Sequence, residues 1–538
     1  MSGSRYLVAR RAALRLGLTA TLAPALGPAA KVAPGWLDEA TLADLQRLMA
    51  NGRLSSVELT GWYLSRIEGA DRRGPRLCSV LEVDPDALRQ AEVLDEERRR
   101  GWLRHPLLHG IPVLLKDVVE TADRTHTTAG SLALLGARAR QDATAAARLR
   151  QAGAVLLGKA NLTVWAGSVT TRVNGWSPRG GQCRNPYKLD RSPGGSSSGS
   201  AVAVAANLCA VAIGVETNGS ILCPAAVNGV VGLKPTVGLT SRAGVIPSSP
   251  TQDSVGVLAR TVADAAAVLG VLAGTDPRDP ATAAARGGIA ADYTRFLDPR
   301  GLAGARIGVP RRVYFGYSEH ADAAAERAIR VLRSGGATVV DPADIPTAEE
   351  MAAAQAPGIV SLYETKHSFE TYLRDTPGEH PRDLPELIEF TRQHADTELK
   401  YFSQRPLELV EAFSDGDLRA PRYVRALAET REMARNRGLD AVFAQHRLDA
   451  LLMPSWTPAW KTDFLNGDVY LGGSSTPSAL AGYPAVSVPS GDALGLPLGI
   501  TLTGPAWSEP VLIRLAFAYE QAARARRTPG FAGPDVGL

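Results

Sequence analysis

The sequence predicts an α/β protein in which a β-sheet is covered by helices on both faces. Three observations support this fold class. Short apolar segments alternate with helical segments between residues 109 and 273, and the same alternation returns between residues 300 and 341. The third observation is that a chain of 538 residues, 45% of them hydrophobic, can bury a large core.

The first half of the chain supplies most of the predicted sheet. Leucine spacing predicts helices over residues 36–100. The run Ile111–Leu115 reads as a buried strand because it is apolar, follows Gly110 and ends at the charged pair Lys116-Asp117. Further on we expect the helix Ala143–Ala152, the strand Ala154–Leu157, the helix Gly199–Ala206, the strand Ala210–Val215 and the helix Val262–Ala273.

The second half contains a helical insertion. A strand, helix and strand are expected at Arg306–Val309, Ala321–Leu332 and Ala337–Val340. Residues from about 346 to 447 are helical in pattern and richer in charge, so we expect them to cap the sheet and shape a pocket. The strands Leu448–Met453, Ala485–Pro489 and Leu498–Thr503 and the helix Glu509–Ala525 complete one domain of residues 31–525, and residues 526–538 form a tail.

The N-terminus has the layout of an export signal over residues 1–30. The pair Arg10-Arg11 precedes the uncharged run Leu16–Leu26, and small residues offer cleavage after Ala25 or Ala30. This pattern predicts export to the periplasm or beyond by a twin-arginine-like route. The alternative is a basic tail on a cytoplasmic protein. The apolar run is too short to span a bilayer, and no other segment reads as a membrane span.

Charge and cysteine content exclude several classes of protein. With 59 basic and 55 acidic residues, the net charge of +4 does not favour a nucleic-acid partner. The four cysteines form no Cys-x-x-Cys pair, and no Cys/His cluster has zinc spacing, so we expect free thiols, no metal and no cofactor.

Two Gly/Ser loops, residues 192–200 and 214–220, flank a small apolar segment. They could be flexible linkers, or Ser197 could be the nucleophile of a G-x-S-x-G elbow. The elbow requires a histidine base, but the later histidines lie in charged or helical contexts. A serine hydrolase without histidine can use a lysine whose pKa is lowered by burial, and Lys116 at the end of an apolar strand suits that role.

Several motifs resemble the amidase signature family over residues 36–525. They are the segments Gly-Ile-Pro-Val-Leu-Leu-Lys-Asp at 110–117, Gly-Lys-Ala-Asn at 158–161, Ser-Pro-Gly-Gly-Ser-Ser-Ser-Gly-Ser at 192–200 and the block 214–235. In detail, residues 180–187, 223–239 and 506–510 are similar to the peptide amidases of that family, which remove the C-terminal amide of peptides. The resemblance implies a central mixed sheet and an amidase.

The resemblance also implies a Ser–Ser–Lys triad. Ser220 matches the nucleophile, Ser196 the bridging serine 24 residues earlier, and Lys116 the base. Ser196 would follow a cis peptide bond after Gly195. The oxyanion would meet the backbone N–H groups of Thr217, Asn218, Gly219 and Ser220. Ser197 either hydrogen-bonds the triad or satisfies a turn, and Asp253 matches a supporting position.

The sequence departs from the family pattern in three places. Asn218 stands where peptide amidases tend to have aspartate, so a local carboxylate is lost while the backbone donor remains, and Leu222 stands where many members have arginine, as in peptide amidases. The segment 164–174 also diverges, and we expect it to line the entrance and affect substrate choice. We expect a small-molecule or peptide amide as the only partner, bound by a monomer or homodimer. The alternatives are an amidase for amino acid or aryl amides, or a glutaminase-type subunit of a tRNA-dependent amidotransferase.

Overall fold

The structure is a computed structural model, and it describes residues 34–168, 173–285 and 287–534. The predicted export signal at residues 1–30 lies outside the described residues. In the described part of the chain, no helix is long and apolar enough to cross a membrane.

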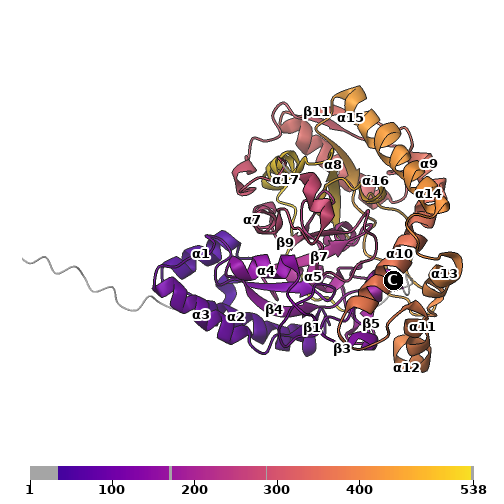
Figure 1. Ribbon diagram of the computed structural model, residues 1–538. Coiled ribbons are helices and arrows are strands. Elements are labelled where there is room, and N and C mark those ends of the chain that lie inside the picture. Colours follow the sequence, from indigo (N-terminus) through magenta and orange to yellow (C-terminus); the bar gives the residue numbers. More distant parts are fainter. Residues whose placement is uncertain (1–33, 169–172, 286, 535–538) are drawn as a thin grey trace, which may run out of the picture.

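A mixed sheet forms the centre of the molecule (Figure 1). It has eleven strands in the order β1-β4-β2-β7-β9-β8-β14-β15-β13-β10-β11. Its strands are β1 (Val80–Val83), β2 (Pro112–Lys116), β4 (Val155–Ala160), β7 (Val211–Glu216), β8 (Val231–Lys234), β9 (Ser254–Ala259), β10 (Arg306–Gly308), β11 (Thr338–Val340), β13 (Ala450–Pro454), β14 (Ala485–Ala493) and β15 (Leu496–Thr503). The strand β2 pairs in parallel with both β4 and β7, whereas β9 is antiparallel to β7 and β8.

Helices cover both faces of this sheet, as predicted. Successive residues of a strand point to opposite faces. Gly499 of β15 lies against Ala226 of α6, whereas Ile500 and Leu502 belong to a core that includes residues of α8 and α17. The helices outside the 346–447 segment are α1 (Leu42–Ala50), α2 (Ser56–Arg66), α3 (Ala87–Arg99), α4 (Thr144–Gln151), α5 (Ser198–Ala205), α6 (Leu222–Val227), α7 (Val262–Leu272), α8 (Glu319–Ser334), α16 (Thr476–Ala481) and α17 (Glu509–Ala523).

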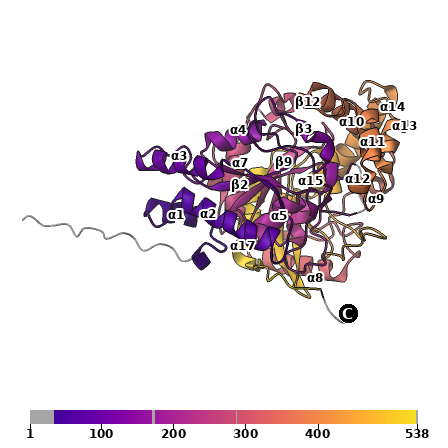
Figure 2. The ribbon, with the colours of Figure 1, turned by 90° about the horizontal axis from the view of Figure 1, so that it is seen from below.

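The segment around residues 346–447 is a series of helices. They are α9 (Ala348–Ala353), α10 (Ala356–Asp375), α11 (Leu384–Gln393), α12 (Ala395–Glu398), α13 (Arg405–Phe413), α14 (Pro421–Arg431) and α15 (Asp440–His446). In two views at right angles, α10 to α14 gather on one side of the molecule (Figures 1 and 2). A short strand, β12 (Gly378–Glu379), ties this segment back by pairing with β3 (Gly136–Ala137).

The structure corrects the strand prediction in three places. Residues 36–100 are not all helical, because Val80–Val83 forms β1 at the sheet edge and pairs with β4. The strands β8 and β9 were not predicted either. Both are buried along their whole length, so they lack the alternation of polar and apolar residues that marks a half-exposed strand.

The helix α5 explains why the first Gly/Ser loop is rich in small residues. All its residues from Ser198 to Ala205 are buried. A side chain on Gly199 would meet the carbonyl oxygen of Ser79 at 2.3 Å and the backbone of Asn161 at 2.5 Å. The helix can therefore enter the interior only because its first turn has no bulky side chain, and the loop that precedes it is placed rigidly.

Candidate active site

Lys116 ends β2 in the interior of the molecule and is fully buried. Its Nζ donates hydrogen bonds to Ser196 Oγ at 2.6 Å and to the carbonyl oxygen of Val215 at 2.9 Å. Burial lowers the pKa of this lysine to about 7, although the negative charges of Asp253 and Glu216 oppose the change. Near neutral pH the amine is therefore present in both protonation states.

The two serines continue the hydrogen-bond chain from Lys116. Ser196 Oγ donates to Ser220 Oγ at 2.9 Å, and both side chains are buried. The peptide bond between Gly195 and Ser196 is cis. A side chain on Gly195 would overlap Asn174 Oδ1 at 2.2 Å, so only glycine fits before Ser196. The structure thus brings the three residues of the predicted triad together.

The turn Thr217–Ser220 connects β7 to α6 and presents backbone N–H groups beside Ser220. Gly219 has φ +82°, and a side chain there would meet the ring of Trp456 at 2.9 Å. Glu216 closes the turn, because its Oε2 accepts hydrogen bonds from the N–H groups of Ile221 at 2.6 Å and Leu222 at 2.9 Å. Within the described residues, no hydrogen bond uses the N–H groups of Asn218, Gly219 or Ser220.

Ser197 joins the two Gly/Ser loops. Its N–H donates to the carbonyl oxygen of Ser220 at 3.1 Å, and its Oγ donates to the carbonyl oxygen of Val215 at 3.1 Å. The Val215 N–H in turn donates to Ser197 Oγ at 3.3 Å. Ser197 therefore hydrogen-bonds the backbone of Val215 and Ser220, on either side of the turn beside the nucleophile.

Asp253 contacts the first residue of the same turn. Its Oδ1 accepts a hydrogen bond from Thr217 Oγ1 at 2.6 Å, and its Oδ2 accepts from the N–H groups of Ser248 and Ser249 at 2.7 and 2.8 Å. Burial raises the pKa of this carboxyl group. Asp253 therefore holds the Thr217 side chain, and its supporting role in catalysis stays a prediction from the resemblance.

Sequence reasoning missed a second buried carboxylate, Glu364 on α10. It accepts hydrogen bonds from Ser249 Oγ, from Thr251 Oγ1 at 2.9 Å and from Tyr423 Oη of α14 at 2.7 Å. Because Ser249 also contacts Asp253, the helical segment is linked to the turn beside Ser220. The sequence holds no signal for this role, because a glutamate in a charge-rich helical segment is usually solvated.

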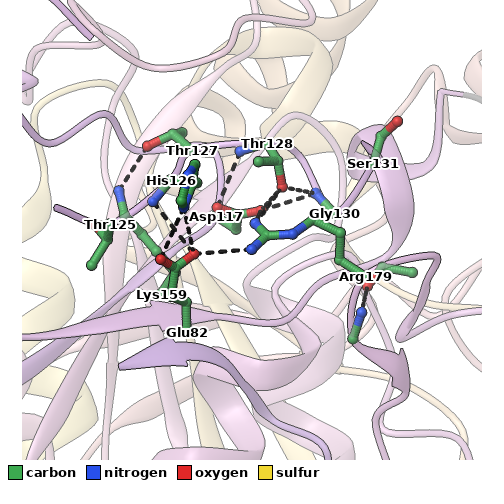
Figure 3. A network of polar contacts seen from close by, with 12 residues as sticks. Glu82, Asp117, Thr125, His126, Thr127, Thr128, Gly130, Ser131, Lys159 and Arg179 are labelled. Atoms are coloured by element: carbon green, nitrogen blue, oxygen red, sulfur yellow. Dashed lines mark hydrogen bonds and ion pairs between the residues drawn. The ribbon is translucent and has the colours of Figure 1, made fainter. Parts of the chain in front are cut away.

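A charged network on the loop after Lys116 holds the end of β2 in place (Figure 3). Asp117 accepts hydrogen bonds from Thr128 Oγ1 at 2.6 Å and from the N–H of Gly130 at 3.0 Å. Arg179 donates to Thr128 Oγ1 at 3.0 Å and to Glu82 Oε2 at 2.9 Å. The loop from Asp117 to Gly130 is thereby fastened to β1 and to the segment that carries Arg179.

The side chains that commonly bind metals are dispersed in this fold. Over the described ranges, no three His, Cys, Asp or Glu side chains are grouped so as to hold a metal ion. All four cysteines lie within those ranges as free thiols, and three of them are buried.

The chain belongs to the amidase family, whose model matches residues 58–513. It is an amide-hydrolysing enzyme, and the predicted family likeness is confirmed. Among solved structures it is similar to the native peptide amidase from Stenotrophomonas maltophilia, with 50% sequence identity and a TM-score of 0.86 over 92% of this chain and 99% of that one.

Two curated relatives extend the comparison. A probable amidase of Arabidopsis thaliana is 41% identical over 502 residues, which cover 92% of each chain. A glutamyl-tRNA(Gln) amidotransferase subunit of Chloroflexus aggregans is 37% identical over 508 residues, or 89% of this chain and 96% of that one.

Proposed function

We propose that the enzyme hydrolyses the C-terminal amide of peptides and releases ammonia through an acyl-enzyme on Ser220. The observation that carries this proposal is the continuous hydrogen-bond chain from Lys116 Nζ through Ser196 Oγ to Ser220 Oγ, with distances of 2.6 and 2.9 Å. It ends beside a turn whose N–H groups can receive an oxyanion. The 50% identity to a peptide amidase supports the choice of substrate.

The first proton transfer depends on the protonation state of Lys116. As an ammonium, its Nζ donates to Ser196, and the Ser196 hydroxyl donates to Ser220. After loss of one proton, the amine can accept from Ser196 while it still donates to the carbonyl oxygen of Val215. Both hydroxyl groups then reverse, so Ser220 donates to Ser196, and its oxygen is ready to attack. A lysine with a pKa of about 7 makes this state accessible at neutral pH.

Attack on the amide carbonyl carbon forms a tetrahedral intermediate. Ser196 takes the Ser220 proton and passes its own to Lys116, while the N–H groups of the turn hydrogen-bond the oxyanion. One such donor is typically worth about 3 kcal/mol of transition-state stabilisation. The Lys116 ammonium then returns a proton through Ser196 to the leaving nitrogen. The C–N bond breaks, ammonia departs, and the acyl group remains as an ester on Ser220.

Water resolves the ester by the same route. It loses a proton through Ser196 to Lys116 as its oxygen attacks the acyl carbon. The intermediate collapses, the Ser220 oxygen recovers the proton, and the peptide acid leaves. The chain needs no further group for these steps, because one lysine serves as base and acid in turn.

Ammonia release from a peptide amide tests this proposal. Ser220→Ala and Lys116→Ala should each abolish it, and Ser487→Ala should retain it, because Ser487 is a buried serine of β14 whose Oγ lies 3.0 Å from Ser455 Oγ, outside the triad. Full activity of either triad variant would overturn the mechanism. Activity limited to amino acid amides or aryl amides would overturn the choice of substrate.

The likeness to an amidotransferase component favours one second candidate, a glutaminase-type subunit that feeds ammonia to a partner. This role predicts glutamine as the substrate and stable association with the other components of an amidotransferase. Glutamine hydrolysis that appears only with such partners would favour it over the peptide amidase function.

A further inference from the structure

Three consecutive large apolar side chains are exposed on the loop between β13 and α16. Val469, Tyr470 and Leu471 expose 57, 59 and 59% of their surface. We call these three residues the apolar rim. No charged residue lies between Val469 and Ser475. A group of exposed apolar side chains of this kind commonly marks a binding surface.

The rim is fastened to the first catalytic loop through Asp468. This carboxylate accepts hydrogen bonds from the Asn174 N–H at 2.8 Å and from Asn174 Nδ2 at 2.7 Å. Asn174 Oδ1 packs directly against Gly195, the residue before Ser196, because a Cβ there would lie 2.2 Å from it. The residue that precedes the rim is therefore tied to the loop that carries the bridging serine.

The other end of the loop is fastened to the turn beside the nucleophile. The ring of Tyr470 lies 5.4 Å from the ring of Trp456, and the far edge of Trp456 is the group that approaches Gly219. A few residues later, Ser475 Oγ donates a hydrogen bond to Asn218 Oδ1 at 2.6 Å. The rim is thus held between contacts to both halves of the site.

We propose that the rim, with the Trp456 ring behind it, is the subsite for the side chain of the substrate residue whose carboxamide is cleaved. This inference rests on the proposed function. An acyl group on Ser220 passes the turn at Gly219, against which Trp456 packs, so its side chain can reach Tyr470 and Leu471. A large apolar side chain gains by leaving water there. A charged one finds no partner in the segment 469–475 and loses hydration.

The specificity ratio between two peptide amides tests the subsite. The probes are N-acetylated dipeptide amides that end in phenylalanine amide or glycine amide, and the measurement is kcat/KM for ammonia release by the full chain. We expect wild type to prefer the phenylalanine amide by at least about tenfold. Leu471→Ser and Tyr470→Ser should each lower that ratio about fivefold.

A matched surface change controls for nonspecific effects. Leu494→Ser alters another leucine that is 76% exposed, in the turn between β14 and β15, and should leave the ratio unchanged. Because both substrates are measured on one sample, partial unfolding of a variant cancels in the ratio. A wild-type ratio near one, or a ratio that Leu471→Ser leaves intact, overturns the subsite. No ammonia from either amide overturns the proposed function itself.

Discussion

Replacing Lys116 by methionine should stabilise the fold near neutral pH while it abolishes activity. Burial lowers the pKa of this lysine from 10.5 to about 7. At 1.36 kcal/mol for each pH unit, holding the lysine in the interior costs the folded state about 4 kcal/mol at pH 7. Methionine carries no charge but removes the two hydrogen bonds of Nζ, worth about 1 kcal/mol each. The variant should therefore unfold with a free energy about 2 kcal/mol higher than wild type at pH 7.

The difference in unfolding free energy between Lys116→Met and wild type should shrink as the pH rises. Because the folded-state pKa is the lower one, the unfolded wild type binds more protons between pH 7 and 10.5, and wild-type stability rises over that interval. At pH 9 the cost of burial is about 2 kcal/mol, so the advantage of the variant should vanish. Urea unfolding of both proteins at pH 7, 8 and 9, followed by tryptophan fluorescence, measures the difference.

A second buried lysine provides the comparison. Burial lowers the pKa of Lys234 to about 8, and its Nζ donates to the carbonyl oxygens of Tyr483 and Pro235, away from the two serines. The difference in unfolding free energy between Lys234→Met and wild type should likewise shrink as the pH rises. A Lys116→Met variant that is less stable than wild type at pH 7, or a gap that does not change with pH, would refute the reasoning.

Three further predictions concern the surroundings of the triad and the N-terminus. Activity should rise with pH through about 7, and Asp253→Asn should move that rise to lower pH, because a negative charge that raises the pKa of the lysine base is removed; an unmoved pH–rate profile would contradict this. Glu364→Gln leaves at least one of three hydroxyl donors without its acceptor, which costs about 1–3 kcal/mol. Glu364→Gln should lower kcat with little change in KM. The control is Glu411→Gln, which should leave kcat unchanged because Glu411 is partly exposed and pairs with Lys366 of the same helix. We also propose that residues 1–30 are a twin-arginine signal: Arg10→Lys with Arg11→Lys should retain the protein in the cytoplasm, and unchanged export in cell fractionation would rule this route out.

The sequence predicted eight of the eleven strands of the central sheet and missed β1, β8 and β9. The end of β2 was recognisable because an apolar run stops at a charged pair, Lys116-Asp117. Strands β8 and β9 are as buried as β2, but each has a glycine in its interior, Gly232 and Gly256, which weakens the strand pattern. Strand β1 was hidden between helices, because four residues at a sheet edge carry too little periodicity to stand out.

The alternation of short apolar and helical segments determined the fold class, and the resemblance of local motifs to the amidase signature family implied Lys116, Ser196 and Ser220. Only the tertiary structure decided the lysine's protonation, because its lowered pKa arises from burial among strands and its partner Ser196 is 80 residues away. It also decided the place of Glu364, which meets Ser249 across 115 residues. Such contacts depend on how distant segments pack, and short-range patterns carry no record of that packing.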